Sequence, residues 1–217
     1  MFDFTGWEKI NEDAYVLRGF IPEDMCDEAF EESFRGSNSP KKHVNPNNKG
    51  IELIHGVMPS LVKKIEGIFE NTQYEVGTFL HWYSEPGKAF GIHRDDQVHD
   101  PHPKKKTFGG VIYLAEMDGG ELYYPVSNTW MQPHKGDLVV QSSSVLHGAN
   151  YVTGNNKRTV TFVVYDKLSP AEEMSEEWHM EHRNESIRNS KEWLQSEIGQ
   201  RWKKEWAWWG VLKEEDE

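Results

Sequence analysis

The sequence predicts an α+β fold in which a jelly-roll β core is buttressed by helices near the N-terminus. Three observations predict it. Segments with helical spacing come early, short strand-like segments separated by Gly and Pro follow, and a charged, Trp-rich segment ends the chain. Helices followed by many short strands are typical of a sheet sandwich or jelly roll covered by helices. The last segment has a helical composition and predicts a helical tail.

Two helices are expected before the main run of strands. Residues 21–34 carry Pro22 near their start and acids in the first turn, which is typical of a helix N-terminus. The second helix is expected over 58–72, where apolar residues recur at helical spacing. Between them, residues 35–50 are rich in Gly, Ser, Asn, Pro and Lys, which predicts a loop.

Strands are predicted where β-branched and aromatic residues gather in short runs. The first is expected ahead of both helices, at 15–20. The later ones are expected at 74–83, 107–116, 121–125, 137–141 and 158–166.

The change of composition near residue 170 divides the chain into a domain over 1–169, with its core at about 74–166, and an extension over 170–217. The extension carries six of the nine tryptophans. Aromatic side chains at this density usually need burial, so packing on the chain's own domain is favoured. An association surface is the alternative, and the sequence leaves the oligomeric state open.

Charge and cysteine content narrow the function classes. The 217 residues have a formal net charge of −12, which argues against a nucleic-acid partner or an anionic membrane. No apolar run is long enough for a membrane span, and no signal peptide is visible. The single cysteine, Cys26, cannot form an internal disulfide, which favours a reducing, cytoplasmic location.

Three residues have the types and spacing of a metal site. His93 and Asp95 are two apart after an apparent strand and turn, so both can reach one face. His147 follows the strand-like "KGDLVV" (135–140) and a polar turn. Two histidines and one carboxylate form the facial triad that holds Fe(II) and leaves positions open. Zinc takes the same ligand types, so these residues alone leave the metal open.

Arg158 adds a candidate anion site. It follows His147 by eleven residues and begins an alternating strand on which Val160, Phe162 and Val164 share its face. A guanidinium among apolar neighbours favours a carboxylate held bidentately, and a dicarboxylate bound to the metal at one end would supply it. A surface salt bridge is the alternative.

Taken in order, His93-x-Asp95, "GGELYYP" (119–125), "KGDLVV", His147 and Arg158 resemble the prolyl-4-hydroxylase-type branch of the 2-oxoglutarate and iron-dependent oxygenases. The resemblance covers roughly residues 74–166. It implies a double-stranded β-helix fold, with Fe(II), 2-oxoglutarate and O2 as cofactor and cosubstrates. Ascorbate is a candidate additional reductant.

The resemblance also implies residue roles. His93, Asp95 and His147 would ligate Fe(II), and Arg158 would bind the distal carboxylate of 2-oxoglutarate. Tyr113 matches a tyrosine that assists this arginine.

Two more residues precede the metal motif. Tyr83, ten residues before His93, matches a tyrosine that faces the cosubstrate. His81 shares its strand parity and is a candidate pocket-lining residue. For Tyr83 and Tyr113 the alternative is a core residue with a satisfied hydroxyl.

This chain departs from the family pattern near Arg158. Collagen-modifying members use lysine at the anchor, and some related oxygenases carry a serine two residues later, where this chain has Val160. Nucleic-acid demethylases of the superfamily carry a second arginine where this chain has Val164. Asp95 is the carboxylate that related halogenases lack, so its presence favours hydroxylation.

The expected activity is hydroxylation of an unactivated C–H bond, first of all in a prolyl residue of a peptide or protein. A free amino acid or other small molecule is the alternative substrate. A non-catalytic metal-binding jelly-roll module is the alternative of another class. Residues 35–50 and 96–107 are candidate lids, with solvated loops as the alternative. His99 and His102 are interpreted as loop residues.

Overall fold

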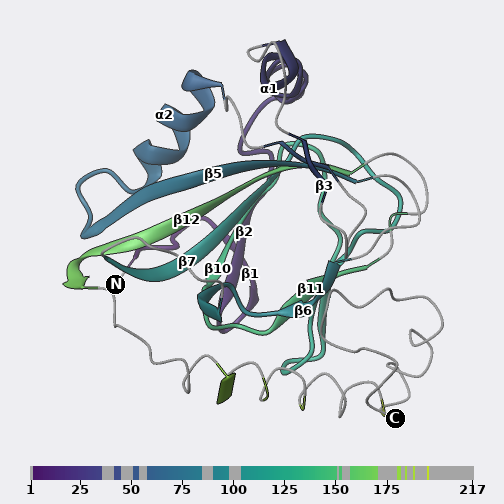
Figure 1. Ribbon diagram of the computed structural model, residues 1–217. Coiled ribbons are helices and arrows are strands. Elements are labelled where there is room, and N and C mark those ends of the chain that lie inside the picture. Colours follow the sequence, from purple (N-terminus) through teal and green to yellow (C-terminus); the bar gives the residue numbers. More distant parts are fainter. Residues whose placement is uncertain are drawn as a thin grey trace.

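The fold of the chain comes from a computed structural model. It describes residues 2–35, 42–44, 51–53, 58–84, 90–97, 104–150, 152 and 157–170, with isolated helical positions at 180, 181, 184, 188 and 195. Within these residues two antiparallel sheets and two α-helices form the molecule (Figure 1).

The larger sheet forms the central layer. Its strands, in order across the sheet, are β1 (Glu8–Asn11), β2 (Ala14–Leu17), β10 (Leu138–Ser142), β7 (Lys104–Tyr113), β12 (Lys157–Pro170), β5 (Tyr74–Ser84), β4 (Ile51–Leu53) and β3 (Lys42–Val44). The smaller sheet has the order β6 (Phe90–His93), β11 (His147–Ala149), β8 (Leu122–Tyr124) and β9 (Thr129–Met131).

Successive side chains along each strand of the larger sheet point to opposite faces, and both faces of this sheet are apolar. One face packs against α1 (Glu23–Arg35) and α2 (Pro59–Ile68), and its core includes Cys26, Leu61 and Ile65 from the helices with Ile112 and Val160 from the sheet. Figure 1 shows both helices on this side.

The other face of the larger sheet packs against the smaller sheet. Tyr113 and Val139 from the larger sheet meet Leu122, Tyr124 and Ala149 from the smaller one in a second buried cluster. Two antiparallel sheets enclosing an apolar layer are the arrangement of a jelly roll. The predicted jelly-roll core with helices on its outer face is therefore confirmed.

The helices and long strands follow the sequence closely, whereas the shortest strands do not. Part of the range predicted as a loop, 35–50, is strand β3, which pairs with β4. The candidate lid over 96–107 contains the start of β7, because that strand begins at Lys104. Neither range is a loop throughout, and the remainder of both lies largely outside the described residues. The strands that the sequence did not predict are β1, β3, β4, β6, β9 and β11.

The C-terminal extension lies largely outside the described residues. Strand β12 runs to Pro170, and the five isolated positions beyond it are helical. Packing of a helical extension on the domain stays a prediction.

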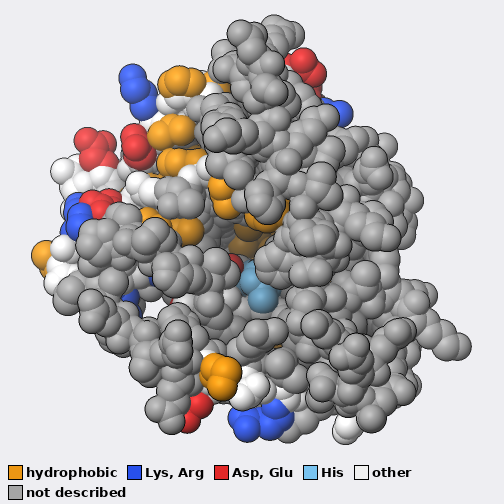
Figure 2. Space-filling model, in the orientation of Figure 1, with side chains coloured by type: hydrophobic (Ala, Val, Ile, Leu, Met, Phe, Trp, Pro, Cys, Tyr) orange, Lys and Arg blue, Asp and Glu red, His pale blue; other side chains and the backbone are white. Residues whose placement is uncertain are grey.

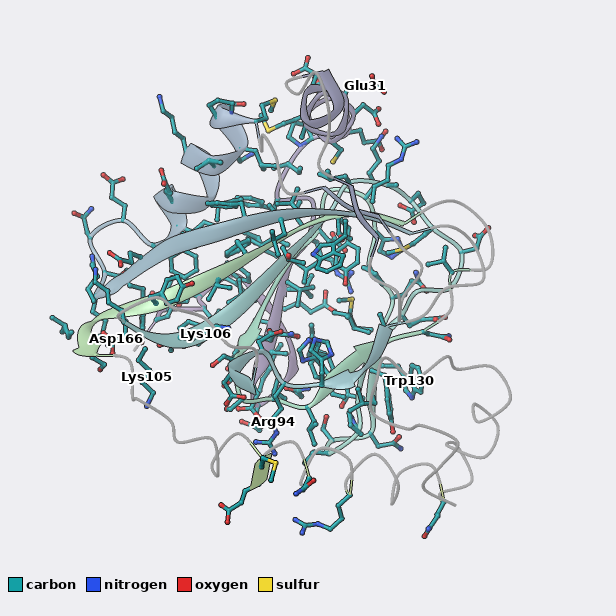
Figure 3. The ribbon with its side chains drawn as sticks, viewed as in Figure 1. Glu31, Arg94, Lys105, Lys106, Trp130 and Asp166 are labelled. Atoms are coloured by element: carbon teal, nitrogen blue, oxygen red, sulfur yellow. The ribbon has the colours of Figure 1, made fainter. Side chains whose placement is uncertain are left out.

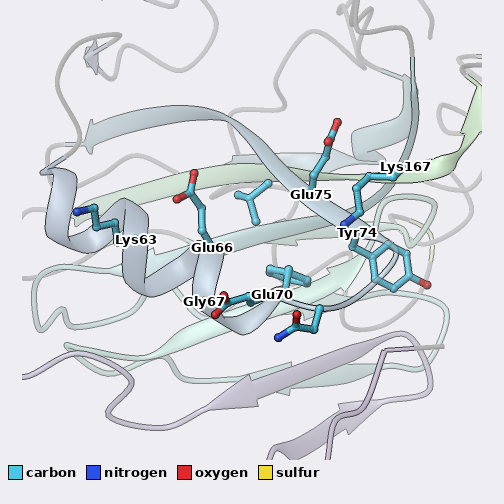
Figure 4. A pocket seen from close by; sticks show the side chains of 10 residues that line it. Lys63, Glu66, Gly67, Glu70, Tyr74, Glu75 and Lys167 are labelled. Carbon is cyan, nitrogen blue, oxygen red and sulfur yellow. The ribbon is translucent and has the colours of Figure 1, made fainter.

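Two surface findings complete the fold. Among the described helices, none combines the length and the apolar character that crossing a membrane requires. A cleft of about 510 Å³ lies between α2 and the start of β5 (Figure 4), lined by side chains that include Lys63, Glu66, Tyr74 and Lys167. None of the predicted site residues lines it.

Candidate metal centre

The three predicted ligands meet in the space between the two sheets. Nε2 of His93 lies 3.5 Å and Nε2 of His147 lies 3.9 Å from Oδ1 of Asp95. One ligand atom from each residue falls within 4.8 Å of the others. Figure 2 shows histidine atoms near the centre of one face of the molecule, set back beside apolar side chains.

Strand pairing brings the two histidines together. His93 ends β6 and is the direct partner of His147, which begins β11. Their ring centroids are 4.3 Å apart. Asp95 arrives differently from the prediction, because β6 ends at His93 and Asp95 begins the short 3-10 helix η1 (Asp95–Gln97). The carboxylate reaches the site by a turn of the chain and not by strand alternation.

The start of η1 is fastened to the larger sheet. Nζ of Lys106 (Figure 3) donates to the carbonyl oxygen of Asp95 at 2.9 Å. The N–H of Asp96 donates to the carbonyl of Ser143, in the turn between β10 and β11, also at 2.9 Å. The turn that carries Asp95 is therefore tied to β7 and to the segment that leads into His147.

One hydrogen bond defines which nitrogen of His147 is available. Nδ1 lies 3.0 Å from the carbonyl oxygen of Val145. A carbonyl can only accept, so Nδ1 carries the proton in this bond and Nε2 keeps its lone pair. Metal-ligating histidines are commonly oriented in this way.

The Asp95 carboxylate stays ionised. Burial by itself would raise its pKa, but the nearby His147 and the hydrogen bond from His93 outweigh burial and hold the pKa well below its usual range. Its second oxygen, Oδ2, lies over Gly109 of β7, where a Cβ would collide with it. The absence of a side chain at Gly109 makes room for the carboxylate.

Each histidine lies close enough to Asp95 to share one divalent ion with it. Nitrogen and oxygen ligands lie about 2.0–2.2 Å from such an ion, so two ligands of one ion stand at most about 4.2 Å apart. The separations of 3.5 and 3.9 Å from Oδ1 satisfy this limit. Two imidazoles and one carboxylate are the donor set of non-haem Fe(II) oxygenases.

Two residues that the sequence did not predict complete the polar surroundings of the site. Nε2 of the Gln141 amide lies 2.7 Å from Nε2 of His147 and 3.5 Å from Oδ2 of Asp95. The hydroxyl of Tyr124 donates to Oε1 of Gln141 at 2.8 Å. Burial, together with the nearby Tyr113 and Asp95, raises the pKa of Tyr124 well above its usual value, so this hydroxyl keeps its proton.

Sequence signals for these residues exist. Gln141 is a polar residue that continues the apolar strand "DLVV" six residues before His147. The pair Gly109–Gly110 interrupts a strand interior, which often marks a close approach of other groups. The sequence does not distinguish Tyr124 from its neighbour Tyr123. Both are tyrosines, and both are buried.

Arg158 lies on the face of β12 that meets the helices. It shares a face with Val160, Phe162 and Val164, as the sequence indicated, and these three belong to the core against the helices. Its carbonyl oxygen accepts a hydrogen bond of 2.8 Å from the N–H of Leu114, which belongs to the same core. The register therefore places this face of β12 toward the helices, and a role of Arg158 in binding 2-oxoglutarate stays a prediction.

The face of β12 that meets the smaller sheet belongs to the alternate residues. Thr159 pairs with Tyr113, and the hydroxyl of Thr161 accepts a hydrogen bond of 2.8 Å from Nε1 of Trp82. Lys157, the first residue of β12, is two residues before Thr159 and four before Thr161, so it occupies a position on the same face of the strand. Its side chain lies outside the described residues.

The predicted tyrosines have different outcomes. Tyr113 is fully buried and packs, together with Val111, in the cluster between the sheets. The side chains of Tyr83 and His81 lie outside the described residues, as do His99 and His102. The roles of Tyr113 and Tyr83 in cosubstrate binding stay predictions.

Comparison with known proteins agrees with this geometry. Residues 78–165 match the family described as "2OG-Fe(II) oxygenase superfamily". No curated protein sequence matches the chain.

Solved structures share the fold. The viral collagen prolyl hydroxylase vCPH from Paramecium Bursaria Chlorella virus-1, in complex with 2OG, is 17% identical with a TM-score of 0.56 over 71% of this chain and 96% of that one. A prolyl-4-hydroxylase from Pseudomonas putida is 17% identical with a TM-score of 0.51, covering 74% and 92% of the two chains. HygX from Streptomyces hygroscopicus, with nickel and 2-oxoglutarate bound, is 11% identical with a TM-score of 0.52, covering 70% and 82%.

The match runs from within β5 to within β12 and includes all three candidate ligands. Residues 78–165 thus match the 2OG-Fe(II) oxygenase superfamily, whose members use Fe(II) and 2-oxoglutarate, and the chain shares its fold with two prolyl hydroxylases.

Proposed function

We propose that this protein is a 2-oxoglutarate- and Fe(II)-dependent dioxygenase that hydroxylates an unactivated C–H bond, first of all in a prolyl residue of a peptide or protein. The observation that carries the proposal is the convergence of His93, Asp95 and His147 within the superfamily match. The fold shared with two prolyl hydroxylases supports the choice of substrate class.

Each part of the site has one proposed role. His93, Asp95 and His147 hold Fe(II), which when bound supplies the oxygen chemistry. In the balanced reaction, substrate, O2 and 2-oxoglutarate give hydroxylated substrate, succinate and carbon dioxide. The residues of the jelly-roll interior exclude water from the reacting centre. The unit is proposed to be the domain over 1–169, with 170–217 as an extension.

Cosubstrate anchoring is assigned to the start of β12. Because the register turns Arg158 toward the helices, we assign the cation for the distal carboxylate to Lys157, the position in phase with Thr159 and Thr161. This assignment removes the departure at the anchor position itself. A lysine stands at the anchor, and Thr159, a buried hydroxyl residue, lies two positions later. Tyr113 is the strand partner of Thr159, so it lies on the same face of the larger sheet, toward the smaller sheet.

A small-molecule substrate is the second candidate. HygX, which shares the fold, has also been solved with hygromycin B bound. The fold can therefore hold a bound small molecule, so a free amino acid or another small molecule belongs in the test.

Turnover in the absence of substrate is the first experiment. Purified protein is incubated with Fe(II), 2-oxoglutarate and ascorbate, and succinate is measured with and without a panel of prolyl peptides, amino acids and small molecules. Mass spectrometry scores the panel for a gain of one oxygen. The dioxygenase reading predicts succinate release stimulated by at least one compound class, and proline-containing peptides distinguish the first candidate from the second.

The alternative to an enzyme is a jelly-roll module that binds a metal without catalysing a reaction. It predicts metal binding with no succinate and no 2-oxoglutarate binding in a calorimetric titration. That combination would overturn the proposed function while leaving the metal site in place.

A further inference from the structure

The carboxylate of Asp95 presents its two oxygens to different surroundings. Oδ1 faces the histidines, at 3.5 Å from His93 and 3.9 Å from His147. Oδ2 faces the larger sheet, where it lies over Gly109 and 3.5 Å from the amide nitrogen of Gln141.

Gly109 and Gln141 reach Oδ2 from adjacent strands. They are direct partners in the pairing of β7 with β10, so they stand side by side on the face between the sheets. One supplies space and the other supplies an N–H donor. A carboxylate oxygen placed between them is held away from the position where the two histidine nitrogens meet.

The Gln141 amide is itself held in one orientation. The phenolic O–H of Tyr124, on the smaller sheet, donates to Oε1, which directs the NH2 group toward the ligands. The side chain is buried, at 2% exposure, so water does not compete for these bonds. Side-chain networks in such surroundings fix geometry because every member has a partner.

We propose that Gln141, oriented by Tyr124, is a positioning residue that makes Asp95 a single-oxygen metal ligand through Oδ1. The proposal rests on the metal site described above and goes beyond the proposed activity. An ion at His147 Nε2 takes the lone pair that the Gln141 amide nitrogen contacts at 2.7 Å, so this nitrogen moves away from His147 when the ion binds, and its N–H is left for Oδ2. Oδ1 alone is then left for the metal, and the remaining coordination positions stay open.

Co(II) is the probe, because it takes the same ligands and its visible absorption reports the number and arrangement of ligands. The wild-type protein, Gln141→Leu, Tyr124→Phe and the double variant are each titrated with Co(II), followed by calorimetry and by the d–d absorption bands. Loss of an outer contact to a ligand typically weakens metal binding about 10–100-fold. Gln141→Leu is expected to lie in this range and to change the spectrum, because the second oxygen becomes free to bind.

Tyr124→Phe removes only a hydroxyl, so it preserves the volume of the side chain. It is expected to weaken Co(II) binding less than Gln141→Leu and to change the spectrum in the same direction. The double variant is expected to match Gln141→Leu alone, because Tyr124 acts through the Gln141 amide. Gln132→Leu is the matched control. The Gln132 amide bonds to the carbonyls of Gly119 and Pro133, so this variant should keep the wild-type affinity and spectrum.

The outcomes are distinguishable. Failure of the wild-type protein to bind Co(II) would remove the metal site and with it the proposed function. Wild-type binding with an unchanged affinity and spectrum in Gln141→Leu would overturn the positioning role alone. If Gln141→Leu fails to fold, an unchanged spectrum in Tyr124→Phe overturns it instead.

Discussion

Gly109 lies directly against the Asp95 carboxylate, at a distance where a single added methyl group would collide with Oδ2. The atom in the way is the end of a side chain and not backbone. A substitution at Gly109 therefore displaces the carboxylate before it disturbs the sheet.

Gly109→Ala is expected to weaken metal binding with little effect on folding. The reduction should approach the roughly 10–100-fold that loss of ligand support produces. Calorimetric titration with Co(II) measures it. Gly67→Ala is the control, since a Cβ there meets nothing within 4 Å, and in helix α2 it should raise stability by about 0.5–1 kcal/mol without changing Co(II) affinity. Equal Co(II) affinity in Gly109→Ala and wild type would contradict the prediction.

Gly110→Ala, in contrast to Gly109→Ala, is expected to lower the stability of the fold and to leave metal binding unchanged. Its Cβ would collide with the ring of Phe162 on the helix side, and that ring is buried at 2% exposure. Overpacking of this kind typically costs about 1–3 kcal/mol. Urea unfolding is expected to show this loss of stability, with Co(II) affinity retained in the folded protein. A stable variant that binds no Co(II) would show that the two faces are coupled.

His147→Ala is expected to abolish saturable Co(II) binding, because it removes one of the three candidate ligands, whose ring is oriented by the carbonyl of Val145. His134→Ala is the matched control. His134 is exposed and bonds to Glu116, and it is not among the three ligands. Binding isotherms of the two variants side by side test the ligand assignment, and wild-type affinity in His147→Ala would refute it.

The cation that holds 2-oxoglutarate can be identified from two neighbouring variants. Lys157→Gln is expected to weaken 2-oxoglutarate binding to the Co(II)-loaded protein roughly 10–100-fold, since a charge-assisted hydrogen bond contributes about 1.5–3 kcal/mol. Arg158→Gln, on the helix face, is expected to leave this affinity unchanged. Calorimetry on both variants settles the assignment, and the reverse result would restore Arg158 as the anchor.

Cys26 should be inert in the native protein. Burial is the main cause that raises the pKa of its thiol to about 11, with nearby acids adding to it, so the thiolate is scarce at pH 8. A coloured thiol reagent at pH 8 is expected to react only after denaturant is added, with one equivalent per chain. Rapid reaction without denaturant would show that α1 opens readily. The cytoplasmic location inferred from this lone cysteine stays a prediction.

The sequence predicted the ligands better than the route by which they meet. Residue type and spacing were enough for His93, Asp95 and His147, because few other chemistries use this combination. Their arrangement depends on the pairing of two short strands, β6 and β11, which have too few residues to show alternation. Long strands such as β5 and β12 show it clearly, and their positions were predicted to within a few residues.

The face of Arg158 shows where strand alternation alone stops being informative. Alternation correctly grouped Arg158 with Val160, Phe162 and Val164. It could not tell which group faces the metal, because both faces of the larger sheet are apolar, one against helices and one against the smaller sheet. Only the pairing of Thr159 with Tyr113 decides between them.

The division of the apolar interior into two layers bears on how the protein is metallated. The helix-side core, with Leu61, Ile65 and Val160, contains none of the three candidate ligands, so we expect the chain to reach its folded state before iron binds. An ion that binds this state then adds stability by mass action alone. Two imidazoles and a carboxylate bind Zn(II) and Cu(II) more tightly than Fe(II). The metal that fills the site is consequently chosen by the free metal concentrations around the folded apoprotein, and growth or purification under excess zinc is expected to yield a folded but inactive population.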